Sequence, residues 1–122
     1  MKAQMKTNDE TIIYQKYLDL IYYSNDLVRK YPKSEKFALV DEIKNALYSG
    51  LRLLIYSLKI YNRQEKLKYL NELDACLKLL QVHMRISFKY KYISMQNYAT
   101  WSDKLTEICK MLGGWISSCL KR

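Results

Sequence analysis

The sequence predicts an all-α protein, an antiparallel four-helix bundle whose helices run up, down, up and down. The 122 residues include only three glycines and one proline, so turns are few and the elements between them are long. Apolar residues recur at spacings of three and four through four long segments, and the junctions between these segments are short. Short junctions make consecutive helices antiparallel neighbours. At this length we expect one domain, residues 1–122, with a single core.

The first predicted helix covers residues 8–31. Asn8 can cap its start, and Asp9 and Glu10 suit the positive end of the helix dipole. Its apolar positions are Ile13, Tyr17, Leu20, Ile21, Leu27, Val28 and Tyr31. Pro32 ends this helix, because the residue before a proline is disfavoured in the helical conformation.

The second predicted helix covers residues 34–61, with Ser34 as its cap and Glu35 in its first turn. It carries two apolar stripes, one of Phe37, Val40, Leu47, Leu51, Leu54 and Leu58, the other of Leu39, Ile43, Ala46, Gly50 and Leu53. A helix that is apolar over so wide an arc has more neighbours than a surface helix has. Either it is the inner helix of the bundle, or its second stripe meets another subunit.

The third and fourth predicted helices cover residues 63–89 and 94–119, the latter capped by Ser94. Their core lines are Leu67, Leu70, Leu73, Leu77, Leu80 and Met84, and Tyr98, Trp101, Leu105, Ile108, Leu112, Ile116 and Cys119. The second line passes through Gly113 and Gly114, each of which costs a helix roughly 0.5–1 kcal/mol relative to alanine. We therefore expect a continuous helix, rather than one that ends at Gly114.

Two adjacent glycines followed by Trp115 indicate a place where another backbone comes close while a large ring packs beside it. Their bare backbone lies at the margin of the predicted core or outside it, so the expected neighbour is a helix of an adjacent subunit. Gly50, in the second stripe of its helix, is the natural complement. The sequence thus predicts an oligomer interface of Gly50, Gly113, Gly114 and Trp115.

The net charge of +9 indicates an acidic partner, such as nucleic acid or an acidic protein surface. The whole excess lies in residues 29–36, 59–68 and 85–91, each with a net charge of +3, and the rest of the chain sums to zero. Their basic residues are Arg29, Lys30, Lys33 and Lys36, then Lys59, Arg63, Lys66 and Lys68, and last Arg85, Lys89 and Lys91. Up-down topology puts residues 29–36 and 85–91 at one end of the bundle, and residues 59–68 with Lys121 and Arg122 at the other.

Lysines also collect at helix C-termini simply because they oppose the dipole there. That explanation does not cover Lys33, Lys36, Lys66 and Lys68, which fall at predicted helix starts, so we favour an acidic partner. Six tyrosines lie in or beside the basic segments: Tyr31, Tyr61, Tyr69, Tyr90, Tyr92 and Tyr98. They could stack on unpaired bases or seal the ends of the bundle, and the sequence favours neither.

Catalytic and metal-binding patterns are missing from the sequence. His83 is the only histidine and has no cysteine or carboxylate at ligand spacing, so we expect a partly buried structural imidazole. No glycine-rich phosphate loop, nucleophile elbow or Cys/His pair occurs. The sequence therefore predicts no enzyme, no metal and no cofactor.

The sequence also predicts a soluble, cytoplasmic protein. Its longest apolar stretch, residues 47–58, is interrupted by Arg52 and is well short of the roughly 20 residues that span a bilayer. The N-terminal residues lack the apolar core of a secretory signal. Cys76, Cys109 and Cys119 are odd in number and are typical of small core residues in a reducing compartment.

Two segments carry a resemblance to a known family. Residues 111–116, MLGGWI, follow a helical pattern from Ser94 to Lys110, and residues 31–39, YPKSEKFAL, precede Ile43-Lys44-Asn45-Ala46-Leu47. The chain resembles the accessory variability determinant proteins of diversity-generating retroelements. Its second segment is also similar to that of a wider group, the four-helix-bundle proteins encoded in intervening sequences of ribosomal RNA genes.

The resemblance implies a positively charged homopentamer of four-helix bundles, shaped like a barrel. It further implies that the barrel binds the reverse transcriptase of the retroelement and its template-repeat RNA. The complex copies this RNA into adenine-mutagenised cDNA, which replaces a variable region of a target gene, a process called mutagenic retrohoming. The accessory protein performs no chemistry. The alternative is a self-assembling scaffold of the intervening-sequence type, which touches acidic protein.

Overall fold

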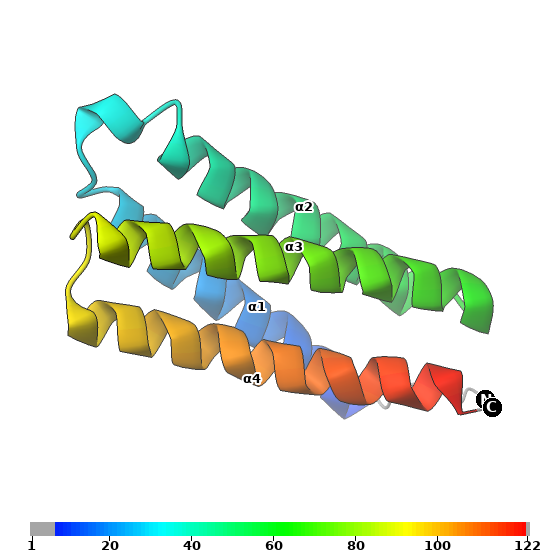
Figure 1. The fold of residues 1–122 in the computed structure, drawn as a ribbon. Coiled ribbons are helices and arrows are strands. Elements are labelled where there is room, and N and C mark those ends of the chain that lie inside the picture. The colour runs from blue at the N-terminus through cyan, green and yellow to red at the C-terminus, as the bar shows by residue number, and fades with distance from the viewer. Residues whose placement is uncertain (1–6, 122) are drawn as a thin grey trace.

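The computed structural model describes residues 7–121, and within that range it contains four α-helices, one short 3₁₀ helix and no strand. The α-helices are α1 (Thr7–Val28), α2 (Leu39–Lys59), α3 (Arg63–Lys89) and α4 (Met95–Leu120), and the 3₁₀ helix η1 (Lys33–Glu35) lies between α1 and α2 (Figure 1). The predicted cap at Asn8 and the terminal Arg122 lie outside the part whose side chains are described.

Consecutive helices are antiparallel, and each helix packs on two others. α1 contacts α2 and α4, and α3 contacts the same two helices from the other side. The α1–α2 and α3–α4 connections lie at one end of the bundle, and the α2–α3 connection lies at the other, with the start of α1 and the end of α4 (Figure 1). The predicted all-α, up-down-up-down four-helix bundle is confirmed.

The predicted end of the first helix was wrong by three residues. α1 ends at Val28 instead of residue 31, because the backbone N–H groups of Lys30 and Tyr31 bond to the carbonyls of Leu27 and Val28 in tight three-residue turns. Such i→i+3 turns are common where an α-helix ends. Pro32 follows, and it has no N–H group to continue a helix.

The predicted start of the second helix was also wrong. Ser34 lies in η1 and does not cap α2, which begins at Leu39. The first helical N–H group, that of Leu39, instead donates to the carboxylate Oε1 of Glu35 at 3.3 Å. Phe37, expected at the start of a core stripe, therefore lies in the connection and is 85% exposed.

The remaining boundaries follow the sequence closely. α2 ends at Lys59, two residues early, α3 has the predicted bounds, and α4 differs from 94–119 by one residue at each end. The Asn62 side chain accepts a hydrogen bond from the N–H of Glu65 (2.9 Å) and caps α3. Ser94 caps α4 as predicted, accepting from the N–H of Asn97 at 3.0 Å. α4 continues through Gly113 and Gly114, so the predicted continuous helix is confirmed.

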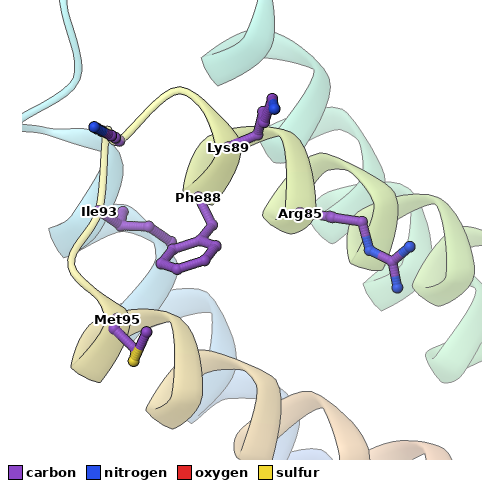
Figure 2. A pocket seen from close by; sticks show the side chains of 6 residues that line it. Arg85, Phe88, Lys89, Ile93 and Met95 are labelled. Atoms are coloured by element: carbon purple, nitrogen blue, oxygen red, sulfur yellow. The ribbon is translucent and has the colours of Figure 1, made fainter.

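The α3–α4 turn closes tightly over the end of α3. Lys91 has a φ of 64°, in the left-handed region, and the N–H of Tyr92 bonds back to the carbonyl of Ser87 at 3.0 Å. This arrangement is the usual left-handed closure of a helix C-terminus, in which glycine is the common residue. Figure 2 shows how the turn leaves the Phe88 ring beside Ile93.

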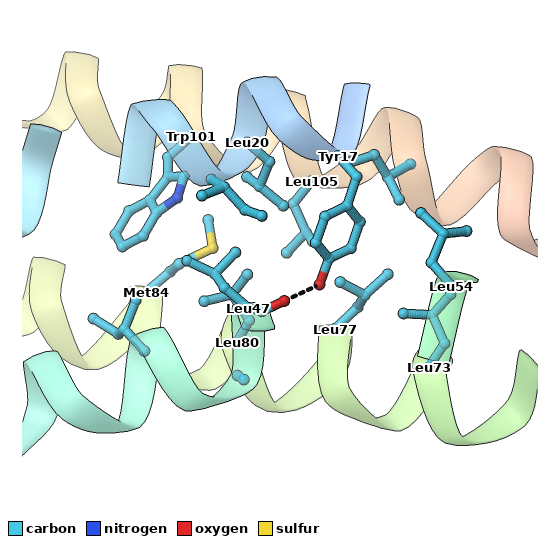
Figure 3. Close-up of a cluster of buried hydrophobic side chains, with 14 of the residues drawn as sticks. Tyr17, Leu20, Leu47, Leu54, Leu73, Leu77, Leu80, Met84, Trp101 and Leu105 are labelled. Atoms are coloured by element: carbon cyan, nitrogen blue, oxygen red, sulfur yellow. Dashed lines mark hydrogen bonds between the residues drawn. The ribbon is translucent and has the colours of Figure 1, made fainter. Parts of the chain in front are cut away.

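The core is built from large side chains of all four helices (Figure 3). The fully buried residues include Ile13, Tyr17 and Leu20 of α1, Ile43, Leu47 and Leu54 of α2, Leu70, Leu73, Leu77, Leu80 and Met84 of α3, and Trp101 of α4. Members of both predicted stripes of α2 are among the buried residues. Its wide apolar arc is therefore accounted for, at least in part, by packing on α1 and α3 of the same chain.

Gly50 was predicted at an oligomer interface, and this prediction was wrong. It is buried inside its own subunit, facing α1, where the Tyr17 hydroxyl occupies the space that a side chain at position 50 would need. The same hydroxyl donates a hydrogen bond to the carbonyl of Leu47 at 2.7 Å (Figure 3). A glycine here lets a polar ring end reach the backbone of α2.

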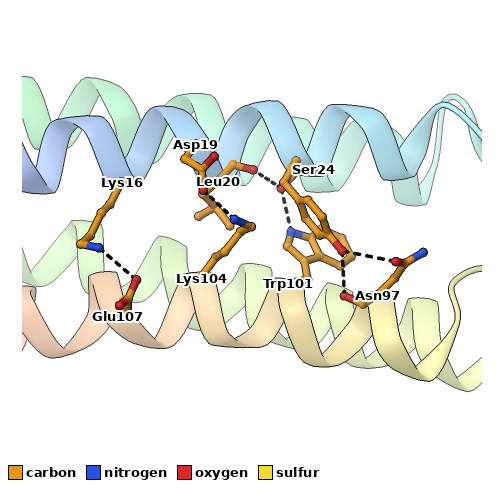
Figure 4. A network of polar contacts seen from close by, with 9 residues as sticks. Lys16, Asp19, Leu20, Ser24, Asn97, Trp101, Lys104 and Glu107 are labelled. Carbon is orange, nitrogen blue, oxygen red and sulfur yellow. Dashed lines mark hydrogen bonds and ion pairs between the residues drawn. The ribbon is translucent and has the colours of Figure 1, made fainter.

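A row of polar contacts fixes α1 against α4 (Figure 4). At its buried centre, the Trp101 indole Nε1–H donates to the Ser24 hydroxyl at 2.7 Å, and that hydroxyl donates to the carbonyl of Leu20 at 2.7 Å. Nearer the surface, ion pairs join Lys104 to Asp19 (2.7 Å) and Lys16 to Glu107 (3.1 Å). A slip of one helix past the other would break the buried pair, so the row sets their register.

Candidate nucleic-acid interface

Seven exposed basic side chains gather where α1 is joined to α2 and α3 is joined to α4. They are Arg29, Lys30, Lys33 and Lys36 of the first connection, and Arg85, Lys89 and Lys91 at the end of α3 and in the turn after it. We call these seven residues the basic end. The two segments lie at the same end of the bundle, as the topology predicted (Figure 1).

Direct contacts join the two connections at the basic end. The rings of Tyr31 and Tyr92 lie 5.2 Å apart, and the Tyr92 hydroxyl donates to the Glu35 Oε2 at 2.7 Å. This hydrogen bond to Glu35 raises the pKa of the Tyr92 phenol, which therefore stays a donor at neutral pH. Because the other carboxylate oxygen of Glu35 accepts from Leu39, this one acidic residue serves to hold the basic end together.

Little of the positive charge at the basic end is neutralised. Arg29 pairs with Asp26 at 3.0 Å, but both side chains are exposed, and such pairs contribute only about 0–1 kcal/mol. The other six basic side chains form no ion pair with a described residue. The basic end is therefore free to attract a polyanion.

Lys33 and Lys36 were selected from the sequence because they fell at a predicted helix start, and the structure shows that they do not lie at one. Lys33 lies in η1 and Lys36 directly follows it, so neither is in the first turn of α2, where the sequence placed them. A three-residue 3₁₀ helix aligns too few peptide dipoles to oppose a lysine appreciably. Their exposure, rather than an unfavourable position on a helix, makes them candidates for a contact.

Two aromatic rings are largely exposed at the basic end. Phe37 is 85% exposed with the Lys36 Nζ 5.5 Å from its ring centroid, and Tyr90 is 62% exposed. Sequence reasoning missed Phe37, because its spacing of three from Val40 is that of a core residue. Exposed rings among cations are typical of surfaces that bind unpaired bases.

The opposite end of the bundle is less basic than the sequence predicted. Lys59, Arg63 and Lys68 are exposed there, but the prediction that Lys66 contacts a partner was wrong. Lys66 is only 6% exposed, its Nζ lies 5.2 Å from the ring centroid of Trp115, and burial lowers its pKa. A lysine can bury its aliphatic stem in this way while the ammonium lies over an aromatic face.

The same contact corrects the prediction for Trp115, which was expected to pack against another subunit. Its ring is 7% exposed within its own chain and belongs to the core. Gly113 and Gly114, in contrast, are exposed, and apart from their chain neighbours and the nearby backbone of α4 itself no described atom comes within 4 Å of the place where a side chain would begin at either. Of the four predicted interface residues, these two still present an open surface.

The six tyrosines divide between the two roles that the sequence left open. Tyr31 is buried, which raises its pKa to about 12, and Tyr69, Tyr92 and Tyr98 are half-buried. Tyr98 stacks on Phe88 with centroids 4.7 Å apart, and these four rings seal the ends of the bundle. Tyr61 and Tyr90 are 81% and 62% exposed, so only these two are available for stacking.

His83 belongs to α3, and its side chain, which is 12% exposed, approaches Glu42 of α2. Its Nε2 is 3.9 Å from the Glu42 Oε1, but burial lowers the His83 pKa, so the ring is neutral at pH 7 and the contact is not an ion pair. Among residues 7–121, no cluster of His, Cys, Asp and Glu could hold a metal ion. Burial raises the pKa of the Cys76 and Cys109 thiols, which keeps them protonated.

The described helices include none that is long and apolar enough to cross a membrane.

The fold and the exposed charge define a helical bundle protein with one strongly basic end. A family model described as bAvd-like matches residues 11–119, so the chain belongs to the bAvd-like family. This confirms the resemblance to the accessory variability determinant proteins. A search of curated protein sequences found no match.

Proposed function

We propose that the protein is a non-catalytic accessory subunit of a diversity-generating retroelement. In this role it binds the reverse transcriptase of the retroelement, its template-repeat RNA and the cDNA copied from it during mutagenic retrohoming. Membership of the bAvd-like family supports the assignment to a retroelement. The observation that carries nucleic-acid binding is the basic end, where seven exposed cations gather and only Arg29 forms an ion pair with a described residue, the exposed Asp26.

The expected mode of binding is electrostatic and largely independent of sequence. The basic end offers lysines and arginines on flexible stems, without a motif that reads base edges. Each phosphate contact releases counterions, so affinity should fall with salt by a slope of about 0.9 per contact on duplex DNA and about 0.7 on a single strand. The subunit performs no chemistry and works in the cytoplasm, with no membrane partner.

We also propose that the subunit acts as a homo-oligomer, a pentameric barrel as the family resemblance implies. The open backbone at Gly113 and Gly114 supports this, because it lets a second helix approach α4 closely. Leu79 and Val82 on α3 are large apolar residues that are about half exposed, and a neighbouring copy would cover them. Light scattering of the purified protein measures the number of copies.

The test of the proposed function combines capture of the polymerase with RNA binding. The tagged protein is co-expressed with the reverse transcriptase of its retroelement, and the captured complex is tested for template-repeat RNA. Affinity for RNA and for a DNA–RNA hybrid is measured over a range of salt. We expect capture of the polymerase and a salt-dependent affinity. An oligomer that captures no polymerase and binds no RNA would instead be a scaffold of the intervening-sequence type.

A further inference from the structure

An open hollow of about 550 Å³ lies within the basic end, at the α3–α4 turn. Its lining is almost wholly apolar: Phe88, Ile93 and Met95 form part of it, and Arg85, Lys89 and Lys91 add mainly apolar atoms, with the Arg85 guanidinium pointing away from the hollow (Figure 2). None of these six residues is acidic. The hollow therefore suits a group that is itself apolar or planar but is flanked by negative charge.

The Phe88 ring offers a stacking surface in this hollow. Tyr98 covers one face of the ring, with centroids 4.7 Å apart and planes inclined by only 6°. Phe88 lines the hollow and Tyr98 does not, so the Phe88 ring is the aromatic group that a ligand in the hollow would meet. A planar group that enters the hollow can extend this pair into a stack of three rings.

Lys91 adds a cation to the hollow from a backbone conformation that is energetically unfavourable for lysine. Its φ of 64° is a conformation that glycine or asparagine adopts easily and that lysine rarely does. The chain nevertheless carries a lysine here, at the rim of the hollow. Backbone strain of this kind is frequent at residues that bind ligands.

We infer that the hollow receives one unpaired base of a single-stranded nucleic acid, while the neighbouring phosphates bind Arg85, Lys89 and Lys91. This inference rests on the proposed function, in which the basic end binds nucleic acid, and adds a preference for single strands. A single strand offers a free ring face beside each phosphate, whereas a duplex keeps its bases stacked inside.

An acidic protein segment with an apolar anchor is the competing occupant. The charge outside the hollow favours nucleic acid, because four more exposed cations continue the basic end along the α1–α2 connection. A polymer with a charge at every residue can follow all of them. Phe37 and Tyr90, both exposed, offer further ring faces along that surface.

The inference is tested by fluorescence anisotropy with a short labelled single-stranded RNA and with the matching RNA duplex. The Phe88→Leu variant keeps an apolar side chain but removes the ring. Because stacking of one base accounts for roughly 5- to 150-fold in affinity, we expect a loss of that order for the single strand and little change for the duplex. Tyr22→Leu, which removes an exposed ring of α1 outside the basic end, is the matched control.

A second variant, Lys91→Asn, removes the charge and suits the left-handed backbone, so it should melt no lower than the wild type. We expect it to weaken single-strand binding and to reduce the salt slope by about 0.7. Melting curves show that each variant is folded.

Three outcomes would overturn the inference. The first is that Phe88→Leu lowers the affinity for single strand and duplex equally, or lowers neither. If the wild type still binds RNA with a salt-dependent affinity, the proposed function then stands without this inference. The second is an acidic peptide that binds and is weakened by Phe88→Leu when RNA is not, which would assign the hollow to protein. In the third, the wild type binds neither RNA, and nucleic-acid binding fails altogether.

Discussion

Adding a methyl group at Gly50 should destabilise the subunit, although alanine is the better helix former. Alanine gains about 1 kcal/mol over glycine in a helix interior. Here, however, its methyl would fall on the Tyr17 hydroxyl and would lie 3.3 Å from the Cδ1 of Leu73. Forcing extra atoms into a packed core typically costs about 1–3 kcal/mol.

The hydroxyl of Tyr17 makes the cost larger, because the ring cannot move away without losing a partner. It is fully buried and bonded to the Leu47 carbonyl, and burial raises its pKa, so it remains a neutral donor. Breaking that bond adds about 1 kcal/mol. We therefore expect Gly50→Ala to lower the free energy of unfolding by about 1–3 kcal/mol after the helix gain is subtracted.

A second substitution tests whether the hydroxyl is the cause. Tyr17→Phe alone should cost about 0.5–1.5 kcal/mol, for the lost hydrogen bond. Combined with Gly50→Ala, it removes the atom that the methyl meets, so the double variant should be less destabilised than the sum of the two single changes. The expected coupling is on the order of 1–3 kcal/mol, within the range found for residues in contact.

Urea unfolding followed by circular dichroism, at one fixed protein concentration, gives the four free energies. Thermal melting should agree, at about 4 °C per kcal/mol for a chain of this size. Strictly additive effects would show that Tyr17 is not what excludes a side chain at position 50. A stable Gly50→Ala subunit that has lost only its oligomer would return Gly50 to a subunit interface and refute the reasoning.

Three further predictions concern the surface and the buried histidine. The double variant Lys33→Glu, Lys36→Glu should keep the melting temperature of the wild type but bind RNA or the polymerase more weakly. The salt slope of single-strand binding should fall by about 0.7 for each lost contact. Unchanged binding would remove both lysines from the interface. Gly113→Ala with Gly114→Ala should stabilise an isolated helix by up to about 1 kcal/mol each, but should weaken an oligomer that packs there, and light scattering distinguishes the two results. Burial lowers the pKa of His83 below its ordinary 6.5, so the unfolded chain binds the proton more tightly than the folded chain does. The stability that this group contributes is therefore complete above about pH 6.5 and is lost as the pH falls through the folded pKa. His83→Leu should flatten that decline in urea unfolding between neutral and acidic pH, and an equally steep decline would exclude this residue as its cause.

The sequence predicted the second half of the bundle better than the first, for a local reason. The start of α4 depends on one side chain, Ser94, and its continuity depends on apolar spacing through Gly113 and Gly114. Both can be read from neighbouring residues. The α1–α2 connection instead depends on a choice between α-helical and 3₁₀ turns around Pro32, and 3₁₀ turns are frequent both at helix ends and as connectors. Because the sequence was interpreted as α-helical from residue 34, Phe37 was predicted in the core, whereas it lies exposed in the connection.

Predictions for single residues failed where they depended on which helices face each other. Gly50, Lys66 and Trp115 were each identified correctly as unusual for their positions. In each case the explanation is a partner distant in sequence but inside the same subunit: the Tyr17 hydroxyl for Gly50, and the Lys66–Trp115 pair for the other two. Spacing along a helix gives a face but not its neighbour. Gly50 and Trp115 were therefore assigned to a second subunit, and Lys66 to an acidic partner, when the residues they contact lie in the same chain.

The burial of Lys66 also decides which end of the bundle is suited to a polyanion. By sequence, both ends are basic. In the structure, one end has seven exposed cations, exposed rings and an apolar hollow, whereas the described part of the other has the exposed ring of Tyr61 and four exposed cations, Lys59, Arg63, Lys68 and Lys121. In a closed ring with its axis along the helices, rotation puts the same end of every copy on the same side. The proposed oligomer would thus gather its basic ends on one face, where a single long RNA could contact several subunits and be held by all of them together.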